Sequence, residues 1–262
     1  MRKHEKFILT PITSVLDEGC TAMAFLDDGL EIYPVSEYMM QSLFLKITGF
    51  QEQKVKCILW ELATDNYELR YERFKRKPIN EASSYEDKQK VFNDLAEAIE
   101  TLSDKSISLL TDVEQEEIVD KTFSYMENFS KQRFLRGWSH RQYSEFKQLF
   151  ANCGKECLLF HNNHKLFSHC NNCKKKSKAK DEHLCKKASL EQVYEKVYKH
   201  RNRCAHNTAS YQQNLPSLDV LEGSDYVFEN YFVRFTMLII IDKMFVKLFE
   251  KYLDLMQNSL VL

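Results

Sequence analysis

The sequence predicts an all-α protein. Glycine and proline are both scarce, with 6 and 4 copies in 262 residues. Sheet proteins need many tight turns and usually contain more of both, so this scarcity favours long helices joined by few loops. Apolar residues also recur every three or four positions in several segments, which is the spacing of one helical face. No internal repeat and no linker rich in Gly, Ser or Pro divides the chain, so we expect one domain over residues 1–262.

The first part of the chain predicts one long helix. Residues 1–33 show no clear period, and the run Asp27–Gly29 suggests a turn between short extended pieces. From about Ser36 a helical period takes over, and Lys77-Pro78 ends it because proline cannot continue a helix. The apolar stripe of this helix is formed by Val55, Ile58, Leu59, Leu62, Tyr67, Tyr71 and Phe74.

The middle of the chain predicts three more helices. The first starts near Ser84 and buries Val91, Phe92, Leu95, Ile99 and Leu102. Thr111 and Glu114 have the spacing of a capping box at the start of the second. Its stripe is Ile118, Thr122, Phe123, Met126 and Phe129. A similar signal at residues 139–142 precedes the third stripe, which is Tyr143, Phe146, Leu149, Phe150, Cys153 and Cys157.

Two helices flank irregular segments in the last third. Residues 163–187 are rich in lysine, asparagine and cysteine, so we expect an exposed polar insertion there. Residues 189–192 then cap a helix whose stripe is Leu190, Val193, Tyr194, Val197 and Tyr198. The final helix is expected from near Ser224 to beyond Leu253, and its mostly apolar centre, residues 235–249, predicts the buried core helix.

The net charge of −1 hides an uneven distribution of charge. Residues 131–210 contain 18 Lys and Arg against 6 Asp and Glu, a net charge of +12, and the rest of the chain carries −13. A local basic surface is enough to attract a polyanion, so RNA is a candidate partner. The alternative is that the two regions pack together and neutralise each other.

No targeting or membrane-spanning segment is evident. The apolar stretch after Met1-Arg2-Lys3 is too short for a signal peptide, and the longest purely apolar run, residues 237–241, has charged flanks. Eight cysteines without an export signal are most simply reduced thiols. We therefore expect a cytoplasmic protein that does not enter a membrane.

Arg201, Asn202 and His206 form the motif with the clearest chemistry. Arg201 continues the apolar face of the preceding helix, where a guanidinium is costly unless an anion or carboxylate meets it. His206 follows five residues later, about 140° round a regular helix. The two side chains can converge only if the helix ends or loosens between them, or if a second subunit completes the site.

These residues resemble the HEPN superfamily, in which an arginine and a polar residue precede a histidine by four to six positions. The setting is similar too, with the motif near a helix end in an all-α domain and a long C-terminal helix after it. The resemblance implies a HEPN-like helical bundle and a metal-independent endoribonuclease whose active site forms between two protomers. It also implies a role in toxin–antitoxin systems or anti-phage defence, with a possible antitoxin partner. Some members carry a tyrosine two residues after the histidine, and this chain has Thr208 there.

The implied reaction is RNA cleavage by the ribose 2′-hydroxyl, which leaves a 2′,3′-cyclic phosphate. His206 would act as general base or acid, Arg201 would clamp the phosphate, and Asn202 would orient the site. No cofactor is needed for this catalysis. The expected RNA-binding residues are the basic neighbours of the motif and the lysines of the insertion. They are His200, Arg203, Lys174, Lys175, Lys176, Lys178 and Lys180, although the lysines could equally be a solvated loop.

The insertion also predicts a structural zinc site. Cys170 and Cys173 have the spacing of a ligand pair, and His183 and Cys185 could complete a tetrahedral set, with His169 as a possible replacement. The alternative is a lysine-rich loop with incidental cysteines. A second set, Cys153, Cys157, His161 and His164, shares one helical stripe, and we expect it to pack rather than bind metal.

Two other functions remain open from the sequence. The chain could be a non-catalytic HEPN-fold protein that binds a nucleotide or RNA or serves as a scaffold, with Arg201 in a structural ion pair. It could instead act through the insertion, as a zinc-dependent nucleic-acid-binding element on a helical support.

Overall fold

The structure is a computed structural model that describes residues 2–26, 33–79, 81–103, 108–153, 190–206 and 230–259, together with Leu166. All regular elements in these residues are helices, which confirms the predicted all-α class. They are α1 (Glu5–Leu9), α2 (Thr13–Ala22), α3 (Tyr33–Asp65), α4 (Tyr67–Tyr71), the π-helical turn η2 (Glu72–Arg76), α5 (Tyr85–Leu102), α6 (Asp112–Ser130), the 3₁₀ turn η3 (Arg133–Leu135), α7 (Arg136–Cys153), α10 (Leu190–His206) and α12 (Tyr231–Ser259).

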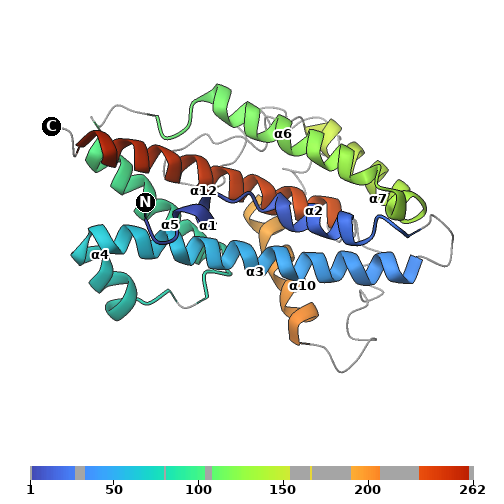
Figure 1. The fold of residues 1–262 in the computed structure, drawn as a ribbon, viewed down its shortest axis with the longest axis horizontal. Helices are drawn as coiled ribbons and strands as arrows, with labels where there is room; N and C mark the ends of the chain where they lie inside the picture. Colours follow the sequence, from blue (N-terminus) through green and yellow to red (C-terminus); the bar gives the residue numbers. More distant parts are fainter. Residues whose placement is uncertain are drawn as a thin grey trace, which may run out of the picture.

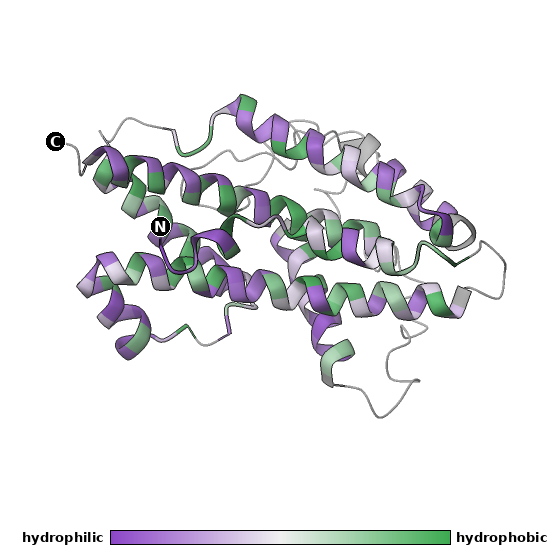
Figure 2. Cartoon of the chain, viewed as in Figure 1, coloured by the Kyte–Doolittle hydropathy of each residue, from purple (hydrophilic) through white to green (hydrophobic). Residues whose placement is uncertain are grey.

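α3 and α12 lie along the long axis of the molecule and run in the same direction, while α6 runs the opposite way (Figure 1). All residues from Tyr231 to Asp242 are buried, so the first half of α12 is enclosed on every side. In Figure 2 much of the ribbon of this half is green, the colour of hydrophobic residues. The prediction that residues 235–249 form the central core helix is therefore confirmed.

A buried ion pair joins the two central helices to the N-terminal segment. Lys54 Nζ on α3 lies 2.6 Å from Asp242 Oδ1 on α12 and also donates to the Thr10 carbonyl oxygen. The other carboxylate oxygen of Asp242 accepts the N–H of Ile12 at 3.0 Å. Burial lowers the pKa of Lys54 and raises that of Asp242, and the attraction between the two opposes both shifts. The pair ties three distant segments of chain together.

Two helix starts in the middle of the chain lie where the sequence predicted them. Ser84 Oγ accepts the Asp87 N–H at 3.1 Å and begins α5. At the start of α6, Thr111 Oγ1 accepts the Glu114 N–H at 3.3 Å, and the Glu114 carboxylate accepts the Thr111 N–H at 2.9 Å. The capping box is thus confirmed, and its two bonds satisfy donors that the first helical turn leaves open.

Other helix starts differ from the predictions. Residues 5–22 form α1 and α2 instead of extended pieces, because Ile8, Ile12, Val15 and Leu16 dock these short helices on the core. α7 begins at Arg136, so residues 139–142 lie inside the helix. α12 follows Asn230, whose side-chain oxygen accepts the Phe232 N–H at 2.9 Å.

The long apolar stripe predicted after Ser36 is buried only in its first half. Val55, Ile58, Leu59 and Leu62 belong to the core. The helix then breaks at Asn66, whose side-chain oxygen accepts the Leu69 N–H and starts α4. This break redirects the chain, and Tyr67, Tyr71 and Phe74 are exposed.

The predicted insertion at residues 163–187 lies outside the described residues except for Leu166. That side chain is fully buried, and its backbone N–H donates to Gln89 Oε1 at 2.8 Å. At this one position the expectation of an exposed segment is wrong, because the leucine finds a place in the core.

Candidate functional site

The predicted motif lies at the end of α10, which crosses α3 (Figure 1). The helix is oriented by buried Val193, Tyr194 and Val197, which pack in the common core. Val193 and Val197 are one turn apart and Arg201 is the next residue in that spacing. The buried face of α10 therefore directs Arg201 toward α3.

Arg201 meets a carboxylate, as a guanidinium on a buried face requires. Its Nη2 donates to Glu52 Oε2 of α3 at 3.0 Å, and its Nη1 donates to Asn202 Oδ1 at 3.1 Å. The side chain of Arg201 is 21% exposed and that of Glu52 is 9% exposed. Of the five N–H groups of a guanidinium, these bonds use two. The other three have no bonded partner within the described residues, so a further anion can approach the solvent side.

His206 is the last residue of α10, and its side chain lies outside what the structure describes. The helix runs without interruption from Arg201 to His206. The two positions are therefore about 7.5 Å apart along the axis and about 140° apart around it. The structure does not bring the arginine and histidine positions onto one face of α10. The sequence left open two ways for the side chains to converge, an end or loosening of the helix between Arg201 and His206, or a second subunit. The structure does not show the first, because the helix continues to His206.

A second buried cation lies in the electrostatic surroundings of Glu52. Lys88 of α5 is fully buried and donates to the carbonyl oxygens of Ala82 at 2.7 Å and Ser83 at 3.3 Å. Ala82 has a φ of 55°, in the left-handed region that non-glycine residues seldom adopt, so the lysine stabilises a strained turn. Tyr194 of α10 donates to the same Ser83 oxygen at 3.0 Å, and its ring lies 5.3 Å from Lys88 Nζ.

These buried groups shift one another's proton affinity. Burial lowers the pKa of Lys88 to about 7, and the negative charge of Glu52 opposes the shift. Burial also raises the pKa of the Glu52 carboxyl, against the charges of Arg201 and Lys88. Burial raises the pKa of Tyr194 well above its usual value, so this phenol stays protonated. Glu52 thus connects the motif arginine electrically to a buried amine that can lose its proton near neutrality.

The sequence analysis did not identify Glu52 or Lys88, although a signal was present. Glu52 precedes Val55 by three residues and Leu59 by seven, so it falls on the predicted apolar stripe of α3. Lys88 precedes Val91 by three residues and Leu95 by seven. A charged residue in register with a buried stripe must find a partner, and both of these do.

The structure does not support the RNA-binding role predicted for His200. Its ring is buried between Phe44 and Tyr231, with ring centroids at 5.2 and 5.8 Å. Arg203 Nη2 lies 3.2 Å from Nδ1, and Cys204 Sγ lies 3.4 Å from Nε2. Burial, together with the charges of Arg234 and Arg203, lowers the pKa of His200 to about 2. A buried neutral imidazole supplies neither a charge nor a surface for phosphate.

Most other predicted site residues fall outside the described part of the chain. These are the lysines Lys174, Lys175, Lys176, Lys178 and Lys180, and the metal ligands Cys170, Cys173, His183 and Cys185. Arg203 is described and half-buried. Within the described ranges no group of three or more His, Cys, Asp or Glu is arranged to hold a metal ion.

Comparison with protein-family models, with curated proteins and with solved structures gives no match to this chain. The likeness to HEPN proteins therefore rests on Arg201, Asn202 and His206 and on the all-α class. Among the described helices, none combines the length and apolar character needed to cross a membrane.

Proposed function

We propose that this protein is a HEPN-type, metal-independent endoribonuclease that works as a homodimer. The observation that carries the proposal is the state of Arg201. Glu52 and Asn202 fix its guanidinium at a partly exposed position, with three N–H groups uncommitted within the described residues. An arginine held in this way is preorganised for a phosphate, because its geometry is set before the substrate arrives.

The reaction needs a base, an acid and a stabiliser of negative charge. His206 would take the proton of a ribose 2′-hydroxyl as its oxygen attacks the adjacent phosphorus, which is a role that imidazoles commonly have. The bond to the 5′-oxygen breaks, and that oxygen takes up a proton from water. Arg201 would stabilise the charge that develops on the phosphoryl oxygens. The products are a 2′,3′-cyclic phosphate and a 5′-hydroxyl, and DNA is not cut because it lacks the nucleophile.

The separation of positions 201 and 206 around α10 supports a site shared between two copies. A regular helix cannot direct both side chains at one phosphate, so the histidine of each copy would complete the arginine of the other. We propose a role in toxin–antitoxin or anti-phage defence on the resemblance described above, and the cytoplasmic location expected from the sequence belongs to the same proposal. A partner that restrains the nuclease is part of this proposal.

One observation favours the alternative of a non-catalytic scaffold or nucleotide-binding protein. The Arg201–Glu52 ion pair neutralises a charge on the buried face of α10 whether or not the protein is a catalyst. In that case replacement of Arg201 would lower stability and have no activity to remove.

The deciding experiment is RNA cleavage in EDTA by the purified protein. We expect a single-stranded RNA to be cut to products with 2′,3′-cyclic phosphate ends, and His206→Ala to lose at least about 100-fold in rate. His140→Ala is the matched control, because His140 is an exposed histidine on α7 and should be dispensable. Absence of cleavage in EDTA, or equal cleavage by His206→Ala, would remove the nuclease proposal and leave the scaffold.

A further inference from the structure

The break at Asn66 exposes an aromatic face formed by Trp60, Tyr67, Tyr71 and Phe74. Tyr67 is 81% exposed and Tyr71 57%, and Trp60 of α3 packs edge-on against Phe74 with ring centroids 5.7 Å apart. The guanidinium of Arg70 lies over the Trp60 ring, 5.9 Å from its centroid. These four aromatic residues are half of the large hydrophobic side chains exposed in the described residues. Exposed aromatic groupings of this kind mark interaction surfaces.

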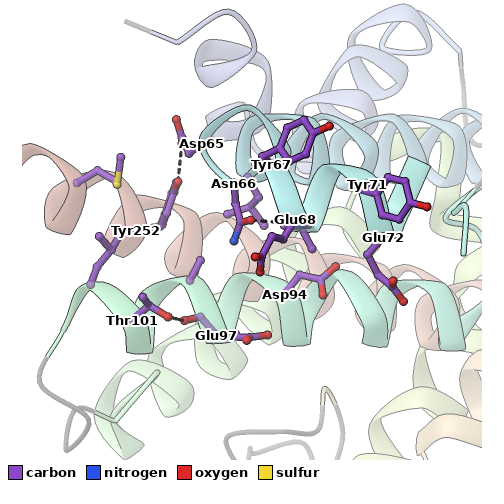
Figure 3. Close-up of a pocket in the computed structure, with 15 residues that line it drawn as sticks. Asp65, Asn66, Tyr67, Glu68, Tyr71, Glu72, Asp94, Glu97, Thr101 and Tyr252 are labelled. Atoms are coloured by element: carbon purple, nitrogen blue, oxygen red, sulfur yellow. Dashed lines mark hydrogen bonds between the residues drawn. The ribbon is translucent and has the colours of Figure 1, made fainter. Parts of the chain in front are cut away.

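The end of the aromatic face where α4 begins is acidic. A cavity of about 610 Å³ lies beside it, between α4 and α5, and is lined by five carboxylates and by no lysine, arginine or histidine. Figure 3 shows Tyr67 and Tyr71 at the edge of this cavity. One of the five carboxylates, that of Asp65, pairs with Arg2 at 2.5 Å and is thereby neutralised.

Two of the cavity's carboxylates give this end its negative charge. Glu68 and Glu97 are exposed and have no ion pair among the described residues. The charge of Arg73 reaches Glu97, but both ends of that guanidinium are bonded to Asp94 at 2.8 Å. The beginning of the face therefore carries two carboxylates that no cation contacts directly in the part of the chain that the structure describes.

The other end of the face is basic. Lys75, Arg76 and Lys77 are exposed, at the end of η2 and just after it. Glu72 is shared between Arg76 at 3.3 Å and Lys77 at 3.5 Å, so one carboxylate meets two cations, and Lys75 has no ion pair within the described ranges. Glu68 and Lys75 are seven positions apart, roughly 10 Å along a helix. Acid and amine thus lie at opposite ends of one short segment.

This distribution of charge makes the face complementary to itself. Glu68, Tyr71 and Lys75 follow one another at spacings of three and four, so the acid, the ring and the amine form one row. A polyanion along this row would meet the carboxylates, and a basic segment would meet the lysines and arginine, so one end repels either. A second copy in the antiparallel direction meets opposite charge at both ends. A two-fold axis between positions 71 and 72 places position 68 of each copy opposite position 75 of the other.

We propose that the aromatic face, with its acidic and basic ends, is the surface through which two copies of this chain pair about a two-fold axis. Burial of the aromatic side chains supplies the apolar contribution, and the two sets of opposite charges fix the antiparallel orientation. The surface would serve the homodimer of the proposed nuclease, and only that link rests on the proposed function. The pairing itself does not require RNA cleavage.

Analytical ultracentrifugation of the full chain over a range of concentrations tests the proposal through charge reversal. Glu68→Lys/Glu97→Lys makes both ends of the face positive, and Lys75→Glu/Arg76→Glu makes both ends negative. Each variant alone should self-associate at least about tenfold more weakly than the unaltered chain, because like charges meet at both ends. An equimolar mixture of the two should form mixed dimers, because every contact then joins opposite charges.

Two further variants separate the face from general effects. Tyr67→Ser/Tyr71→Ser leaves the charge unchanged and should also weaken self-association several-fold, because it removes apolar area. Glu116→Lys/Glu250→Lys is the matched control, since it makes the same charge change at exposed acids of α6 and α12. It should associate within about twofold of the unaltered chain. Circular dichroism of each variant confirms that the helices are intact.

Three results would overturn the proposal. The first is an unaltered chain that stays monomeric at about 0.1 mM, or a dimer that the face variants do not weaken. The second is a mixture of the two charge-reversed variants that forms no mixed dimer, or equal weakening in the control variant. The third is single-stranded RNA, or a lysine–leucine peptide, whose binding the face variants abolish while self-association is unchanged. Absence of RNA cleavage would remove the nuclease proposal and leave these sedimentation results standing.

Discussion

The protonation state of the Lys88 amine affects the charge around the candidate site. It is buried, it stabilises the strained turn at Ala82, and it interacts electrostatically with Glu52, which in turn holds Arg201. When Lys88 loses its proton, Glu52 loses one of the positive charges that act on it, and those of Arg201 and Lys56 remain. The buried amine thus links the local charge of the motif to pH.

The sign of the stability effect follows from the depressed pKa of Lys88. Between pH 7 and pH 9 the unfolded lysine keeps its proton and the folded one loses it. The free energy of unfolding therefore increases as the pH rises. We expect the unfolding free energy of the unaltered protein to increase by about 2 kcal/mol relative to that of Lys88→Met over this range. Urea denaturation at both pH values measures it. A difference that does not change with pH would show that Lys88 stays charged when buried.

At the scale of helices, apolar periodicity predicted the core but not which charged residues within it form pairs. Val55, Leu95 and Phe245 are buried as the stripes indicate, because helical spacing alone decides which face meets the core. Glu52 lies on such a stripe too, but its partner Arg201 is 149 positions away and cannot be identified from local pattern. Pairings between distant elements depend on topology, which periodicity does not contain.

Helix boundaries were predictable only where a local hydrogen-bonding motif defines them. Ser84 and Thr111 cap their helices through bonds to residues three positions on, so the signal is complete within four residues. The start of α7 at Arg136 and the helical state of residues 5–22 have no such motif. Those elements depend on contacts with α3, α6 and α12, and the exposure of Tyr67 depends on the break at Asn66.

The ion pair between α3 and α12 gives a prediction at the same scale. Asp242→Leu leaves Lys54 buried without its carboxylate, and we expect it to lower the free energy of unfolding by about 3–5 kcal/mol. The double variant Lys54→Met/Asp242→Leu should lose clearly less unfolding free energy than the two single variants lose together, because no uncompensated charge remains. Lys46→Met is the control, since the Lys46–Glu18 pair is exposed and should matter little. Additive effects in a urea double-mutant cycle would contradict this account of the pair.

At the scale of the whole molecule, the proposed activity belongs to a pair of chains. The geometry of α10 separates positions 201 and 206, so a single chain presents the arginine without the histidine beside it. Activity would then depend on concentration, and dilution below the dimer dissociation constant would abolish it. A site divided in this way also makes each copy's motif necessary to its partner.

Mixing two inactive variants tests that division. Arg201→Ala and His206→Ala should each be inactive alone. After exchange of subunits about half of the dimers are mixed, and each mixed dimer has one intact site of its two, so about a quarter of the full activity should return. The measurement is RNA cleavage in EDTA before and after exchange. If no activity returns although mass spectrometry detects mixed dimers, each phosphate requires both residues from one chain or all four from the pair.

The central position of α12 has a consequence for the order in which the chain folds. Lys54 and Asp242 are separated by 188 positions, and α3, α5, α6 and α7 are all made before the helix that fills the space between them. A ribosome-bound chain that lacks α12 therefore exposes the apolar faces of these helices and leaves Lys54 without its carboxylate. Contacts this distant in sequence slow folding, since the connecting loop must close before they form. The proposed nuclease would thus remain inactive throughout its own synthesis, and partly made chains would depend on chaperones rather than on a specific inhibitor.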